Sequence, residues 1–186
     1  MKRMISPLLA LALLAGGSHF NLRAAPSPGE VDFGKFSRPG AGVNYVEINV
    51  KQNLLSLAAR LVEKAEPEAA KLLRSIQLVR VNVLGLTDDN RGDMEKRAQD
   101  VRSHLEKQNW ERTVTVQDKD GQDVGVYVKA RGDEALEGLV VIVLDGKKQE
   151  AVFINIVGDI KPEQLAALGE AMHIDPLKKA GAAVKK

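Results

Sequence analysis

The second half of the chain carries four consecutive segments that are predicted to be β-strands, separated by short connections. These segments cover residues 112–117, 124–129, 139–144 and 151–157. Asp120-Gly121 and Asp145-Gly146 mark two of the connections, and an Asp-Gly pair tolerates the positive φ that tight hairpin turns need. Strands joined by such short connections pair antiparallel, because a parallel pair needs a long crossover. This half of the chain therefore predicts an antiparallel meander.

One of these segments is apolar on both faces. The run from Leu139 to Leu144 contains only leucine, valine and isoleucine. Such a run is typical of an interior strand that is covered on both sides. Val141 and Val143 are thus predicted core residues, and we expect Val143→Asp to bury an unpaired charge at a cost of several kcal/mol.

The first half alternates strands with helices. Residues 43–50 and 77–86 have strand periodicity, and Pro67 separates two helices between them, because proline lacks an amide and suits a first helical turn. The apolar side of the first helix is predicted to comprise Leu54, Leu57, Ala58, Leu61, Val62 and Ala65. A third helix carries an apolar stripe of Met94, Ala98, Val101 and Leu105.

A last helix is expected to open at Pro162 and to bury Leu165 and Leu168. The predicted order is β-α-α-β-α-β-β-β-β-α. This order predicts an α+β fold, with a mostly antiparallel six-stranded sheet and helices packed mainly on one face. The loop before the last helix holds Gly158, which we expect to let the chain turn from strand to helix.

Residues 1–25 have the build of a secretory signal peptide. Lys2 and Arg3 precede an apolar run over residues 4–15, and small residues follow it. The apolar run is shorter than the ~20 residues that cross a bilayer as a helix, which favours a cleaved signal over the alternative of a retained membrane anchor. Cleavage is expected near residue 17 or at residues 24–25.

The composition excludes several classes of site. The chain has no cysteine, so disulfides, thiolate metal ligands and lipid attachment through cysteine are excluded. It holds 27 Lys and Arg against 25 Asp and Glu, and cleavage after Ala25 would remove Lys2, Arg3 and Arg23, leaving 24 against 25. Nucleic acid usually requires a basic face, so a nucleic-acid partner is not expected.

The segment between the signal and the domain is rich in proline and glycine. Residues 26–42 are expected to form a flexible linker, in which Val31, Phe33 and Phe36 are the side chains able to dock on the domain. A single domain is expected over residues 43–174. A basic tail over residues 175–186 follows, and contact of its lysines with an anionic surface is the alternative to a solvated terminus.

No catalytic, cofactor-binding or metal-binding residue is predicted. His104 and His173 have no second histidine at ligand spacing. Asp88, Asp89, Asn90 and Asp93 lack the glycine and the closing glutamate of a calcium loop, so capping of the next helix by Asn90 or Asp93 is the favoured interpretation. The enzymatic alternative is an envelope hydrolase whose site is built from scattered acids: Glu47, Asp145 and Asp159.

Three stretches together carry a family resemblance: residues 46–60, residues 68–83 and residues 138–169, the last with the run Asn-Ile-Val-Gly-Asp-Ile at 155–160. The chain resembles the bacterial domain-of-unknown-function family 4252, whose members are mostly exported or lipid-anchored envelope proteins. The resemblance implies no catalytic residues. It also implies a role in envelope regulation, because similar genes often stand beside extracytoplasmic-function sigma factors. Lys161 departs from the family, which often has an acid or a serine before the last helix.

The expected function is that of an exported bacterial envelope protein acting as a non-enzymatic protein-interaction or regulatory module. Its partner would be an unknown envelope protein. No cofactor is expected, no membrane span is expected after cleavage, and the oligomeric state is left open.

Overall fold

The structure is a computed structural model that describes residues 27–38, 40–119, 121–161 and 164. The predicted signal peptide, the predicted last helix with Leu165 and Leu168, His173 and the basic tail lie outside these described residues. Within them no helix has both the length and the apolar character that a membrane span requires.

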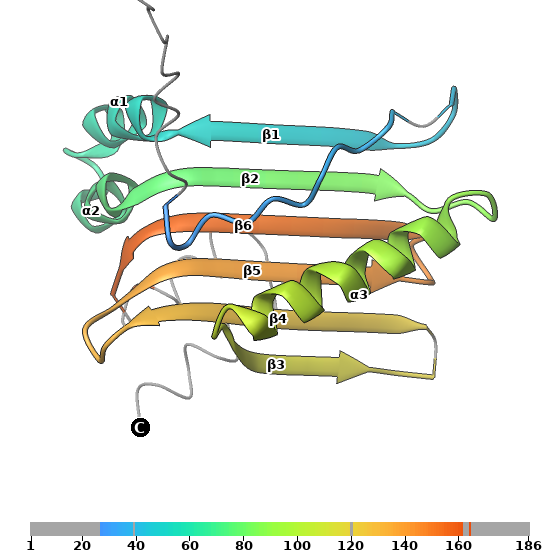
Figure 1. Cartoon of the computed structure of the whole chain (residues 1–186). Helices are drawn as coiled ribbons and strands as arrows, with labels where there is room; N and C mark the ends of the chain where they lie inside the picture. Colours follow the sequence, from blue (N-terminus) through green and yellow to red (C-terminus); the bar gives the residue numbers. More distant parts are fainter. Residues whose placement is uncertain (1–26, 39, 120, 162–163, 165–186) are drawn as a thin grey trace, which may run out of the picture.

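Six antiparallel strands form one open sheet in the order β1-β2-β6-β5-β4-β3 (Figure 1). The strands are β1 (Tyr45–Lys51), β2 (Ile76–Gly85), β3 (Glu111–Gln117), β4 (Gln122–Arg131), β5 (Ala135–Asp145) and β6 (Glu150–Ile160). The helices are α1 (Gln52–Val62), α2 (Pro67–Ser75) and α3 (Arg91–Lys107). The predicted α+β fold and element order are confirmed over these elements. The meander of the second half forms four neighbouring strands, with β5 and β6 in the interior of the sheet.

The helix α3 crosses one face of the sheet, as Figure 1 shows. Its buried side chains are Met94, Ala98, Val101 and Leu105, which are the stripe that the sequence predicted. Arg102 ties the helix to β4 through two hydrogen bonds to the Asp123 carboxylate, of 2.7 and 2.9 Å. Charge-assisted bidentate pairs of this kind fix orientation as well as position, so α3 has a defined placement over the sheet.

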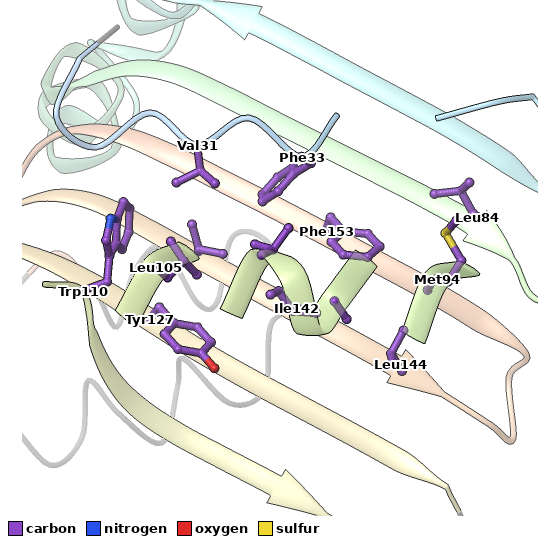
Figure 2. Packing of buried hydrophobic residues seen from close by; sticks show 14 of the residues in the cluster. Val31, Phe33, Leu84, Met94, Leu105, Trp110, Tyr127, Ile142, Leu144 and Phe153 are labelled. Atoms are coloured by element: carbon purple, nitrogen blue, oxygen red, sulfur yellow. The ribbon is translucent and has the colours of Figure 1, made fainter. Parts of the chain in front are cut away.

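Two apolar clusters lie on opposite faces of the sheet. The cluster under α3 includes Tyr127, Ile142 and Phe153 (Figure 2). The cluster of the other face includes Val141, Ile154 and Ile156, together with one leucine from each of the first two helices. Because β5 contributes buried side chains to both clusters, the prediction of an interior strand at 139–144 is confirmed. Val143, however, is only half-buried, whereas Val141 is fully buried.

Helices α1 and α2 lie beside one end of β1 and β2 (Figure 1), and Pro67 opens α2 as predicted. The sequence-based prediction of the apolar face of α1 is wrong in part. Leu55 and Ala59 are buried, while Leu54, Leu57 and Leu61 are 53%, 54% and 79% exposed. The reason is position: α1 packs chiefly against α2 and reaches the sheet only at the ends of two strands. Among the described residues, one side of α1 therefore has no neighbouring element.

Gly158 does not end the strand, contrary to expectation. It lies within β6, which continues to Ile160. A Cβ atom at this position would overlap the carbonyl oxygen of Ser75, where β2 begins after α2. The glycine therefore allows a close approach of two backbones rather than a turn.

Residues 27–37, here called the strap, lie across the same face as α3 and run alongside β2 and β6 (Figure 1). Val31 and Phe33 are 2% and 4% exposed and belong to the cluster under α3, and Phe36 packs against that cluster (Figure 2). The sequence left open whether these three side chains dock on the domain, and in the structure they do. The strap is thus packed on the domain rather than free as a linker.

Candidate functional site

The three acids of the hydrolase alternative are not brought together. Asp145 ends β5 and pairs with Glu150 at the start of β6, while Asp159 lies nine residues further along β6. At about 3.3 Å per residue in a strand, this separation is roughly 30 Å. Glu47 lies on the edge strand β1. These carboxylates cannot act on one substrate bond.

Each of these acids already has a partner. Asp145 accepts the backbone N–H groups of Lys147 and Lys148 and so shapes the turn into β6. Asp159 pairs with Arg131 at 2.6 Å. Glu47 accepts the hydroxyl of Tyr45 at 2.8 Å, and this hydrogen bond raises the pKa of Tyr45 above its ordinary value. Their roles are local and structural.

The loop before α3 is organised by Asn90, which occupies the N-cap position of α3 but turns its side chain to the loop. Its Oδ1 accepts the N–H of Thr87 at 2.8 Å, and its Nδ2 donates to the carbonyl oxygen of Gly85 at 3.0 Å. Asp93 lies in the first turn of α3, and the expected hydrogen bond from the Asn90 side chain to a free helix amide is not formed. Asn90 instead closes the turn that leads out of β2. Among the described residues, no group of three potential ligands is placed to hold a metal ion.

His104 lies exposed on α3, beside the strap. Beneath the same helix, burial raises the pKa of the Tyr127 phenol. The Tyr127 hydroxyl has no hydrogen-bond partner in the described part of the chain. A phenol with a raised pKa stays protonated at neutral pH and does not serve there as a base.

The strap is held by side chains of the sheet and of α3, and Asn155 is the central one. This residue is fully buried in β6. Its Oδ1 accepts the N–H of Val31 at 2.9 Å, and its Nδ2 donates to the carbonyl oxygens of Gly29 at 2.9 Å and Leu139 at 3.2 Å. One amide side chain therefore satisfies two backbone groups of the strap. This role of Asn155 was not predicted, although a lone asparagine in an apolar strand is a signal that could have revealed it.

Two arginines hold the rest of the strap. Arg80 of β2 donates to the carbonyl oxygen of Val31 at 3.1 Å and pairs with Glu30 at 3.0 Å. Arg97 of α3 donates to the carbonyl oxygen of Phe33 at 2.6 Å, and its guanidinium lies 4.5 Å from the centre of the Phe36 ring. The strap is thus bound by Arg80 from β2 on one side and by Arg97 from α3 on the other.

The first turn of the strap fits against β5 through two glycines. A Cβ atom on Gly29 would overlap the carbonyl oxygen of Glu137, and one on Gly138 would lie 2.7 Å from the Gly29 Cα and 2.5 Å from the Trp110 ring. Only residues without a Cβ allow these two backbones to meet. This close contact between Gly29 and Gly138 determines where the strap begins to pack on the face of the sheet.

The strap does not fill the channel in which it lies. A hollow of about 600 Å³ opens between it and α3, bordered by Asn90, Asp93, Lys96 and Asp100. A second hollow of about 950 Å³ opens between it and the first two strands, bordered by Tyr45, Asn49, Asn82 and Gln108. We call this whole channel between α3 and β1 the strap groove.

A second surface is apolar and exposed. Six large apolar side chains in the described residues are exposed, and five of them lie on β1 and α1: Val46, Ile48, Leu54, Leu57 and Leu61. β1 is an edge of the sheet and continues into α1 without an intervening residue. We call this surface the β1–α1 apolar edge. The sixth residue, Val116, is on the opposite edge strand β3.

The sequence matches one family model, described as a domain of unknown function (DUF4252), over residues 42–168. That match covers more than half of the chain. The chain belongs to the DUF4252 family. No curated protein and no solved structure gives a match. The DUF4252 match contains the whole sheet, α1 to α3 and Asn155, whereas the strap precedes it. In this DUF4252 protein the strap groove is therefore built by the family domain and occupied in part by a segment that precedes the match.

Proposed function

We propose that this DUF4252 protein is an exported bacterial envelope protein that acts as a non-enzymatic protein-interaction or regulatory module. The β1–α1 apolar edge carries the proposal. Exposed apolar groups gathered on adjoining elements mark protein–protein contact sites, whereas single ones scattered over a surface need no explanation. Here five of the six belong to two consecutive elements.

The two elements suit two familiar modes of protein recognition. In the described part of the chain β1 is an edge strand, to which a partner strand can add by backbone hydrogen bonds, with Val46 and Ile48 on one face of the added pair. Leu54, Leu57 and Leu61 stand at i, i+3 and i+7 on α1, which places them on one side of that helix. The other edge, β3, exposes mainly charged and hydroxyl side chains, which discourage strand addition.

We expect Ile48→Glu to abolish partner binding while the fold persists. Ile48 is 41% exposed, so a carboxylate at this position remains hydrated in the free protein but would be desolvated in a complex. Capture of envelope proteins by the tagged chain, measured by quantitative mass spectrometry, should fall at least about tenfold. The matched control is Val116→Glu, because Val116 is 37% exposed on the opposite edge strand. Equal capture by the two variants and the parent would refute the proposal.

The N-terminal sequence supports the export part of the proposal. A basic start, an apolar run and small residues make up residues 1–18. A reporter fused behind residues 1–42 should accumulate outside the cytoplasm, and changing Leu11 and Leu13 to arginine should retain it inside. N-terminal sequencing of the native protein should give a start after residue 17 or near residues 24–25. A native protein that begins at Met1 would contradict export by cleavage.

A further inference from the structure

The strap lies in the groove in the manner of an extended peptide bound to a protein. It runs without secondary structure, and alternate residues are buried: Gly29, Val31 and Phe33 face the sheet, while Asp32 and Gly34 are exposed. We propose that the strap groove is a peptide-binding site of this domain, and that the strap is its tethered occupant. The ligand class is an extended peptide with a glycine, a branched aliphatic residue and an aromatic residue at alternate positions.

The groove recognises the backbone of the strap through side chains. No backbone–backbone hydrogen bond joins residues 29–36 to the sheet in the described part of the chain. Instead, Asn155, Arg80 and Arg97 bind one N–H and three carbonyl groups of the strap. Contacts with backbone groups are available to any extended peptide, and the pockets for alternate side chains then select among sequences.

The aromatic side chains of the strap, Phe33 and Phe36, pack against Phe153 of β6. The Phe33 ring lies 5.7 Å from the Phe153 ring, and the Phe36 ring lies 5.3 Å from it, both in tilted geometry. Figure 2 shows Val31 and Phe33 pointing from the strap into the cluster beneath α3. Phe153 belongs to the DUF4252 domain and Phe33 does not. The DUF4252 domain thus supplies the apolar surface of the groove, and the strap that lies on it precedes the domain.

The connection between strap and domain allows exchange. Exposed residues at 40–42 link the two, and Gly42 has a φ of 89°. A short tether of this kind gives the strap an effective concentration on the order of millimolar, so a free peptide at micromolar concentration does not displace it. Cutting the tether removes this high effective concentration, so that the strap then competes with a free peptide on equal terms. The open hollows on both sides of the strap give an incoming peptide access to the groove.

The test uses the full chain with a specific protease site inserted between Gly40 and Ala41. After cleavage, the fragment with the strap is expected to stay bound and then to exchange with a fluorescent peptide of residues 27–37. Fluorescence anisotropy should show saturable one-to-one binding to the cut protein and none to the uncut protein at the same concentration. A peptide with Val31 and Phe33 both replaced by serine should not bind.

Variants of the domain separate recognition from folding. Arg97→Ala should weaken peptide binding about tenfold, because it removes a charge-assisted hydrogen bond, whereas Lys107→Ala, exposed on the same helix and not lining the strap groove, should not change binding. Ile48→Glu should also leave it unchanged, since the β1–α1 apolar edge is a different surface. A cut chain that unfolds, or one that stays folded and releases the strap without binding the peptide, would overturn the proposal. So would equal binding by the Arg97→Ala and Lys107→Ala variants.

Discussion

Val141→Asp should leave the protein unfolded, or nearly so, at room temperature. Val141 is fully buried in β5 between Val126 and Ile154, which are themselves 0% and 6% exposed. A carboxyl group at this position has no polar partner and cannot reach water. We expect the free energy of unfolding to fall by about 5 kcal/mol, which is comparable to the whole stability of many domains. Urea denaturation followed by circular dichroism measures the loss.

The control for this prediction lies two residues away on the same strand and the same face. Val143 is only half-buried, so its replacement by aspartate lets the carboxyl group turn toward solvent. Val143→Asp should therefore cost about 2 kcal/mol and leave a cooperative transition. If both variants melt within a few degrees of the parent, the centre of β5 is not the interior of the core.

Asn155→Ala should be the most damaging change of a polar residue. The substitution removes three hydrogen bonds and leaves the backbone groups of Gly29, Val31 and Leu139 without their partner in a buried place. Buried groups that lose a partner cost about 1–3 kcal/mol each, partly relieved by relaxation of the strap. We expect a loss of about 3 kcal/mol. Trypsin should also cut faster after Lys35, which lies exposed in the strap.

Asn82→Ala is the matched control, because Asn82 is also a buried asparagine on the same face, in the neighbouring strand β2. The described residues show no hydrogen bond between its side chain and the strap. Its replacement should cost about 1 kcal/mol or less and leave cleavage after Lys35 unchanged. Equal losses for the two variants would mean that the strap is held by Val31 and Phe33 alone.

The sequence was sufficient to predict the elements whose signal is local. Alternation with a period of two placed four of the strands, apolar stretches placed β5 and β6, and spacings of four, three and four placed the buried stripe of α3. Pro67 divided α1 from α2 because its ring is compatible with a first helical turn and not with a helix interior. The apolar run of β5 showed that this strand is interior. In each case the pattern depends on residues close together along the chain.

Only the tertiary structure decided which apolar and polar residues meet a partner. Nothing in the periodicity of α1 shows that Leu54, Leu57 and Leu61 stay exposed, because that depends on the helix lying at the end of the sheet. Glu47, Asp145 and Asp159 could have formed one site on the sequence alone, and strand order separates them.

The strap groove depends most on tertiary structure. Gly29 and Val31 meet Asn155 across 126 and 124 residues of chain. No local pattern in residues 26–42 distinguishes a free linker from a docked strap, since both are rich in glycine and proline. The difference lies in a buried amide on β6 that satisfies backbone groups which a free linker would leave to water. Such long-range pairing is determined by the folded sheet and not by the residues on either side of the pair.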